Sequence, residues 1–327
     1  MTFAKKAYLA AGFGAVAAGL TLPVLAQATL NGAGASFPAA FYQRAFAGVA
    51  DKVRVNYQSV GSGAGVRQFV AGSVDFGATD EPIKASEAAK VKRGVIQFPA
   101  VGGTIAVAFN KADCKSLKLT QQQTVNIFLG KITSWDQLKC GKGKITVAHR
   151  SDGSGTTFAF TNSLSSFSSE WKSKVGEGKS VKWPVGVGGK GNEGVAGLIS
   201  NTPGAIGYLN QSYVKGAIKA AALQNKAGKF VLPSEATGAA ALNNITLDAN
   251  LAGEEPNPAG ANSYPISTLT WILAYKTGNG DKAPAIRTAM LYLLSARAQS
   301  QAESLGFVPL KGSILSASKK AVAQIGR

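Results

Sequence analysis

Histidine and cysteine are scarce in this sequence. Its 327 residues contain one histidine, His149, and two cysteines, Cys114 and Cys140. No CxxC pair and no Cys/His cluster occurs, so neither a zinc site nor any other metal is predicted. A chain with one histidine also has few groups that could serve as a general base near neutral pH. The composition therefore argues against metal-dependent and histidine-dependent catalysis, and we expect no cofactor.

Acidic residues are also few. Asp and Glu total 17 against 35 Lys and Arg, which gives a formal net charge of +18. A balance this basic favours anionic partners. The lysines are spread from Lys52 to Lys320 without a dense block, and no aromatic residues alternate with them, so nucleic acid is not expected. Two interpretations of this charge remain open: a positive field that steers small anions to a site, or a basic surface that is only solvated.

Beyond the N-terminus, no apolar run is long enough to span a bilayer. Two lysines precede an apolar stretch, residues 7–25, which is followed by the tripeptide AQA (26–28) with a small residue at each end. This pattern is typical of a cleaved signal peptide over residues 1–28, with cleavage after Ala26 or Ala28. A retained membrane helix is the alternative, although the stretch is short and contains a proline. Cleavage would remove two lysines and no acidic residue, leaving a charge of +16.

Export determines what is expected of the two cysteines. Cys114 and Cys140 flank a helix predicted over about 120–129, with Gly130 as its C-cap. In an oxidising compartment two cysteines commonly pair, which would link the segments at both ends of this helix. Two buried free thiols are the alternative. No cysteine lies near the cleavage site, so a lipid anchor is not predicted.

Strand and helix patterns alternate along the exported chain. Strands are predicted at 53–57, 74–79, 145–148 and 205–209, and helices at 66–71, 157–164, 194–199 and 283–296. This alternation favours an α/β fold with mainly parallel sheets, in which ligands bind at the carboxyl ends of strands. Two long β-like runs, 98–109 and 264–275, fit as paired crossovers between two lobes, with the ligand between the lobes.

Residues 149–158 (HRSDGSGTTF) carry the strongest local signal. They bring a guanidinium, several hydroxyls and glycine-permitted backbone amides to the start of a predicted helix, which are the groups that an oxyanion site needs. Asp152 can hold the side chain of Arg150. A polar turn that only caps the helix is the alternative. Loops 32–38, 61–63 and 79–82 share this chemistry.

The chain resembles the periplasmic phosphate-binding proteins of phosphate ABC transporters. The resemblance rests on NGAGASFP (31–38), NYQSVGSGAG (56–65), VDFGATDEP (74–82), RSDGSGTTF (150–158), KWPVGVGGKGNEG (182–194), PGAIGY (203–208) and YPIST (264–268). It implies a two-lobed α/β binding protein of type II-like topology. Each lobe would have a central, mostly parallel sheet flanked by helices, and the two crossover strands would form the hinge. The first lobe would comprise 29–102 plus 268–327, and the second 103–267.

The resemblance also implies the ligand set, the partner and the location. The phosphate ligands would be Ser36, Phe37 through its amide, Ser62, Asp80, Arg150, Ser154, Gly155 and Thr156, with Asp152 orienting Arg150. The family often has threonine where this chain has Ser36, and the hydroxyl is retained. The protein would be a periplasmic monomer that is not an enzyme and delivers phosphate to the permease subunits of an ABC transporter.

Asp80 suggests how phosphate is selected. An ionised carboxylate can only accept hydrogen bonds. Phosphate keeps at least one proton at neutral pH and can donate a hydrogen bond to Asp80, whereas sulfate has no proton with which to do so. The site would therefore exclude sulfate by leaving buried acceptors unpaired. An N-cap role before Pro82 is the alternative for Asp80.

Two catalytic hypotheses are weaker. Ser154 lies between glycines and could be imagined as the nucleophile of a phosphatase, but Asp152 occupies the place of the first glycine of a G-x-S-x-G elbow. Residues 188–191 (GGKG) resemble a nucleotide phosphate loop only superficially, since no Ser or Thr follows the lysine. Phosphatase activity remains the alternative function.

Overall fold

A computed structural model describes residues 1–2, 4 and 27–327. Most of the predicted signal peptide lies outside the described residues. The strands are β1 (Thr29–Gly34), β2 (Arg54–Ser59), β3 (Phe76–Thr79), β4 (Val95–Asn110), β5 (Lys118–Leu119), β6 (Thr146–Arg150), β7 (Val187–Gly189), β8 (Ala205–Asn210), β9 (Lys219–Ala220), β10 (Ala222–Gln224), β11 (Phe230–Val231) and β12 (Ser267–Tyr275).

Strands and helices alternate over most of the chain, and the last three helices follow β12 in succession. They are α1 (Ala39–Ala47), α2 (Ser62–Val70), α3 (Ala85–Ala88), α4 (Gln121–Phe128), α5 (Gly155–Phe167), α6 (Ser169–Lys174), α7 (Gly191–Asn201), α8 (Glu235–Leu242), α9 (Ala283–Leu293), α10 (Ala296–Ser304) and α11 (Gly312–Ala323). In the described part of the chain, no helix combines the length and hydrophobicity needed to cross a membrane.

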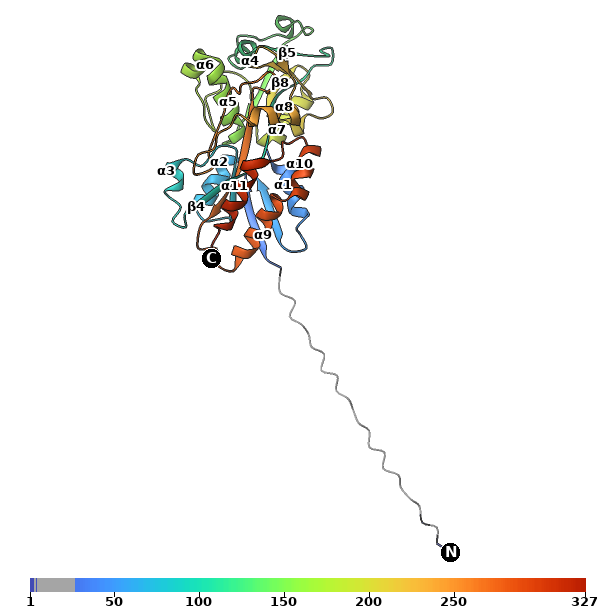
Figure 1. The fold of residues 1–327 in the computed structure, drawn as a ribbon. Helices are drawn as coiled ribbons and strands as arrows, with labels where there is room; N and C mark the ends of the chain where they lie inside the picture. Colours follow the sequence, from blue (N-terminus) through green and yellow to red (C-terminus); the bar gives the residue numbers. More distant parts are fainter. Residues whose placement is uncertain (3, 5–26) are drawn as a thin grey trace.

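The molecule has two lobes (Figure 1). One lobe contains α1, α2, α9 and α11 together with the C-terminus, and the other contains α4, α5, α6 and α8. Segments far apart in the sequence thus lie together in the first lobe. The helices cover a mixed sheet whose central strands β3, β4, β8 and β12 are almost entirely buried.

The sheet is mixed rather than mainly parallel. Its nine described strands follow the order β2-β1-β3-β12-β4-β8-β6-β7, with β9 also paired to β4. The outer groups β2-β1-β3 and β8-β6-β7 pair in parallel, whereas β12 and β4 run antiparallel to their neighbours. The expectation of mainly parallel sheets is correct for these outer groups. It misses the antiparallel centre of the sheet, where the two long crossover strands β4 and β12 pair with each other.

The long strand β4 belongs to both lobes. Its first part pairs with β12, from Ser267 opposite Thr104 to Tyr275 opposite Val95. Its last part, from Ile105 to Asn110, pairs with β8. All but the end residues of this strand are buried. Strand β4 therefore runs from one lobe into the other, whereas β12 pairs with β3 and with the first part of β4.

Some helices begin earlier than the apolar pattern predicts. Helix α2 starts at Ser62 rather than near residue 66, and α5 starts at Gly155 rather than at 157. The reason is that glycines and hydroxyl residues form their first turns. Gly61, at the N-cap of α2, has a φ of 87°, which favours glycine. These first turns hold the polar groups of the site.

Cys114 and Cys140 form a disulfide, with Cα atoms 5.0 Å apart and a sequence separation of 26. The bond encloses α4 and the short 3₁₀ helix Trp135–Leu138. It therefore links both ends of a segment whose buried side chains, Phe128 and Trp135 among them, belong to the hydrophobic core.

We predict that the double substitution Cys114→Ala/Cys140→Ala lowers the free energy of unfolding by about 3 kcal/mol, because a loop of this size is no longer closed in the unfolded chain. Chemical denaturation followed by circular dichroism measures the change. Wild-type protein under reducing conditions should show a similar shift. Equal unfolding midpoints for the double variant and the oxidised wild type would contradict a stabilising role.

Candidate anion-binding site

Strand ends and helix starts from both lobes meet at one point. Strands β1, β3 and β6 end at Gly34, Thr79 and Arg150, and the helices that follow β1 and β6 begin within five residues of those ends. The polar side chains at this point are almost fully buried. They are Ser36, Ser62, Asp80, Arg150, Ser154 and Thr156.

The guanidinium of Arg150 is held from one side by Asp152. Arg150 Nε donates to Asp152 Oδ1 at 2.7 Å and Nη2 donates to Oδ2 at 2.5 Å. Gly191 N also donates to Asp152 Oδ1 at 3.0 Å. Burial acts to raise the pKa of Asp152, but the hydrogen bonds and charge of Arg150 outweigh it and hold that pKa below its usual value. The paired carboxylate thus leaves Arg150 Nη1 facing the site, 3.4 Å from Thr156 Oγ1.

Asp80 lies opposite this cation at the end of β3. Its Oδ2 accepts from Thr156 Oγ1 at 3.1 Å, and its Oδ1 accepts from Thr270 Oγ1 at 2.9 Å. Burial raises the pKa of Asp80 to about 6, although hydrogen bonds from Thr270 and Thr156 and the charge of Arg150 oppose the rise. The carboxyl is therefore mainly ionised at neutral pH and mainly protonated at pH 5.

Backbone amides supply further donors. The N–H groups of Phe37, Ser62, Gly155 and Thr156 make no hydrogen bond to another residue within 27–327. They lie just before α1 or in the first turns of α2 and α5, where helix geometry leaves amides without an intrahelical partner. The positive ends of three helix dipoles accompany them. Such amides bind an anion without bringing in another formal charge.

Contacts connect the candidate residues of the two lobes. Asp80 N donates to Ser62 Oγ at 3.2 Å within the first lobe. A Cβ atom built on Gly155, in the second lobe, would lie only 2.7 Å from Asp80 Cβ and Ser62 Oγ. Gly63 N donates to Gly153 O at 2.8 Å, again from one lobe to the other. The glycines therefore allow the two backbones to approach closely at the site.

Phe37 and Ser154 also stabilise the fold around the site. The ring of Phe37 is fully buried, with its centroid 6.0 Å from that of Phe307. Ser154 Oγ accepts from Thr157 N at 3.0 Å as the N-cap of α5. The predicted residues are thus all at the meeting point. For Ser154 the hydroxyl is shared with helix capping.

Two residues of the cluster were absent from the predicted set. Asn192, at the start of α7, is fully buried and donates to Ser36 Oγ and Thr156 Oγ1. Thr270 donates to Asp80 from the middle of β12. Thr268 and Thr270 alternate with apolar residues in the run 264–275, and that period-2 pattern was a usable signal. Asn192 lies in the stretch 182–194 that carries the family resemblance, but only the fold brings it next to Ser36.

A lysine of the second lobe pairs with carboxylates of the first lobe beside Asp80. Lys179 Nζ lies 3.0 Å from Glu81 Oε2 and 3.6 Å from Glu87 Oε2. Glu81 is buried, and Lys84 lies 3.4 Å from its other oxygen. This pair adds a second electrostatic contact between the lobes at the edge of the site.

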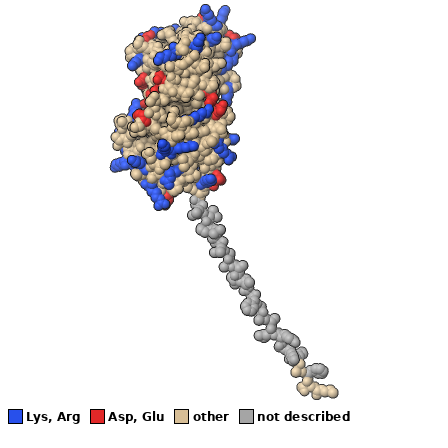
Figure 2. Space-filling view, in the orientation of Figure 1, with Lys and Arg blue, Asp and Glu red and all other residues tan. Residues whose placement is uncertain are grey.

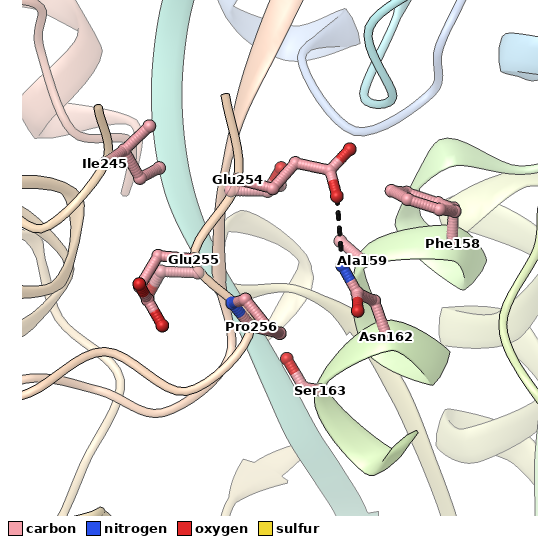
Figure 3. Close-up of a pocket in the computed structure, with 10 residues that line it drawn as sticks. Phe158, Ala159, Asn162, Ser163, Ile245, Glu254, Glu255 and Pro256 are labelled. Atoms are coloured by element: carbon pink, nitrogen blue, oxygen red, sulfur yellow. Dashed lines mark hydrogen bonds between the residues drawn. The ribbon is translucent and has the colours of Figure 1, made fainter. Parts of the chain in front are cut away.

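A small pocket lies next to the site, between α5 and the loop before β12 (Figure 3). Glu254 points toward α5 and accepts from Asn162 Nδ2 at 3.0 Å, whereas the neighbouring Glu255 points the other way. Burial and the nearby Glu81 and Glu177 raise the pKa of Glu254 to about 7. The pocket lining combines two glutamates and an asparagine with hydroxyl and apolar side chains and includes no lysine or arginine, so it does not extend the anion site.

On the face that Figure 2 shows, Lys and Arg side chains are distributed over both lobes without one dense block. In residues 1–2, 4 and 27–327, no group of three or more His, Cys, Asp or Glu side chains is placed to hold a metal ion.

A two-lobed α/β fold with buried donors between its lobes is typical of binding proteins that close around a small ligand. A family model described as a PBP superfamily domain matches residues 23–297. The phosphate-binding protein PstS of Haemophilus influenzae is 40% identical over 96% of this chain and 97% of its own length. That of Methanocaldococcus jannaschii is 35% identical over 84% of this chain and 79% of its own. The chain belongs to this superfamily and to the family of the PstS phosphate-binding proteins.

Solved structures agree on the fold. The phosphate-binding protein from Stenotrophomonas maltophilia superposes with a TM-score of 0.70, at 22% identity, over 89% of this chain and 93% of its own. An ancestral soluble variant of the human phosphate-binding protein gives 0.77, at 21% identity, over 92% of this chain and 99% of its own. The names of these relatives describe binding proteins rather than phosphatases, and the family to which this chain belongs is not enzymatic.

Proposed function

We propose that this protein captures inorganic phosphate between its two lobes and delivers it to the permease subunits of an ABC transporter. The observation that carries the proposal is the guanidinium of Arg150, fixed by Asp152 among unpartnered amides and opposite Asp80. The names of the relatives support phosphate as the ligand. The protein would act in the periplasm as a monomer after removal of residues 1–28.

The proposed ligand groups are those of Ser36, Phe37, Ser62, Asp80, Arg150, Ser154, Gly155 and Thr156. The hydroxyls and amides would replace the water shell of the anion with donors that are already in place, which lowers the cost of binding. Arg150 would be the one formal positive charge in contact with phosphate. Asp152 would act through Arg150 by holding the Arg150 guanidinium in the plane that an oxyanion needs.

The proposed lobes are residues 29–102 plus 268–327 and residues 103–267. The pairing of β4 supports this division, because its first part, up to Thr104, pairs with β12 and its last part pairs with β8 of the other lobe. Binding would draw the lobes together by bending at these strands. The close approach of Gly155 to Asp80 and Ser62 supports this closing step.

We predict that the exported chain, stripped of phosphate, binds phosphate at one site in calorimetric titration at pH 8, and that excess sulfate leaves the affinity unchanged. Ionised Asp80 accepts a hydrogen bond from the phosphate O–H, whereas sulfate has no O–H to donate. Equal competition by sulfate would leave an oxyanion receptor without the proposed selectivity. Absence of binding by folded protein would overturn the proposed function.

A second prediction concerns pH. Because burial raises the pKa of Asp80 to about 6, the carboxyl gains a proton as the pH falls through that value and can then donate to sulfate. Sulfate should therefore compete with phosphate at pH 5 and not at pH 8, a difference of about tenfold or more in apparent sulfate affinity. Titrations at both pH values measure this.

The variant Asp80→Asn is the matched control for the pH prediction. Its amide can donate to sulfate at every pH, so sulfate should compete at pH 5 and pH 8 alike, while phosphate binds less tightly than in the wild type. Sulfate exclusion in this variant at pH 8, equal to that of the wild type, would refute the role of Asp80.

A third prediction tests closure through Gly155→Ala. The added methyl group would lie 2.7 Å from Asp80 and Ser62 of the other lobe, so the lobes cannot meet as closely and phosphate affinity should fall about tenfold or more. Folding should be preserved, because alanine suits a helix better than glycine. The control is Gly197→Ala in α7, where a methyl group meets nothing within 4 Å. If both variants keep wild-type affinity, close approach at Gly155 is not required.

A further inference from the structure

The hydroxyl of Ser36 already accepts two hydrogen bonds from one residue. Asn192 N and Asn192 Nδ2 both donate to Ser36 Oγ, each at 2.9 Å. A serine hydroxyl has two lone pairs and one proton. With both lone pairs engaged, the proton of Ser36 is the only capacity that this hydroxyl has left. Ser36 is therefore set as a donor toward the site.

Asn192 also orients the hydroxyl of Thr156, whose proton is directed to Asp80. Its Oγ1 accepts from Asn192 Nδ2 at 3.2 Å and from Arg150 Nη1 at 3.4 Å. It then donates its single proton to Asp80 Oδ2 at 3.1 Å. Two N–H donors thus fix the direction of this hydroxyl too, and one of them comes from Asn192.

The orientation of Asn192 is itself determined by the backbone. Asn210 N, which can only donate, lies 2.8 Å from Asn192 Oδ1. The other end of the amide must therefore be the NH₂ group, which faces Ser36 and Thr156. Asn192 is fully buried, so water does not compete for these bonds. Asn210 in turn donates to Thr104 O of the crossover strand β4, at 3.4 Å.

We propose that Asn192 is a positioning residue that makes the hydroxyl of Ser36 an obligate donor to the bound anion. Ser36 belongs to the proposed first lobe, whereas Asn192 belongs to the second, so the arrangement is completed when the lobes close. Without Asn192 the Ser36 hydroxyl is free to rotate and to present a lone pair to the anion. This inference rests on the proposed function, since the anion measured is phosphate.

The test is a double-mutant cycle on the exported chain, with phosphate affinity measured by calorimetry. Asn192→Ala and Ser36→Ala should each weaken binding by about 10- to 100-fold, since each removes or misdirects a hydrogen bond to a charged group. If Asn192 acts through the Ser36 hydroxyl, its loss matters less once that hydroxyl is gone. The double variant should therefore bind at least about fivefold more tightly than the product of the single losses predicts.

Asn192→Asp keeps the shape and provides a second cycle if the alanine variant does not fold. The carboxylate repels phosphate whether or not Ser36 is present, but it misdirects a hydroxyl only when Ser36 is there. Its effect should thus also be smaller in the Ser36→Ala background. Asn225→Ala is the control: Asn225 is buried and donates to Gly260, Ala261 and Ser263 carbonyls, away from the site, so it should lose stability and keep affinity.

The outcomes separate this inference from the proposed function. Wild-type protein that binds no phosphate would contradict the proposed function. The wild-type protein could instead bind phosphate, with a loss of affinity in each double variant that equals the product of the two single losses within about twofold. That result would show that Asn192 does not act through Ser36 and would overturn the inference. A loss of affinity in Asn225→Ala as large as that in Asn192→Ala would also overturn it.

Discussion

The burial of one guanidinium is the constraint on which the site depends. A charge removed from water is costly unless it is paired and its hydrogen bonds are satisfied. Arg150 is 4% exposed, and Asp152 engages two of its nitrogens while Gly191 N holds Asp152 in place. This arrangement leaves one edge of the fork for a ligand. It also explains why the remaining donors are neutral, since a second buried cation would need its own counterion.

The surroundings of the Asp80 carboxyl, opposite Arg150, have opposing effects on its pKa. Burial alone favours its neutral form, whereas Thr270, Thr156 and Arg150 favour the ionised form, and the resulting pKa of about 6 lies between the extremes. The acid is thus charged at neutral pH while remaining within reach of protonation. A carboxyl exposed to water would stay ionised over this whole range and would have little effect on which anion is enclosed.

The sequence predicted those parts of the site that are local in the chain. Glycine-rich turns before Ser62 and Gly155, and the Arg150–Asp152 spacing, carry their chemistry within a few residues. The alternation of strands and helices likewise predicted the α/β fold and the two long crossover strands. Asn192 was missed because its partners Ser36 and Thr156 come from other segments, which only the sheet topology brings together. The antiparallel centre was missed for the same reason, since strand direction depends on pairing between distant segments.

The two long crossover strands are hydrogen-bonded to groups at the candidate site. Strand β12 supplies Thr270 to Asp80, and Thr268 Oγ1 lies 3.4 Å from the Asp80 carbonyl. Strand β4 accepts from Asn210, which in turn holds Asn192. If the lobes close on an anion as proposed, a change in how those groups are engaged would reach these strands through one or two hydrogen bonds. The proposed coupling between capture and closure would then need no pathway through the rest of either lobe.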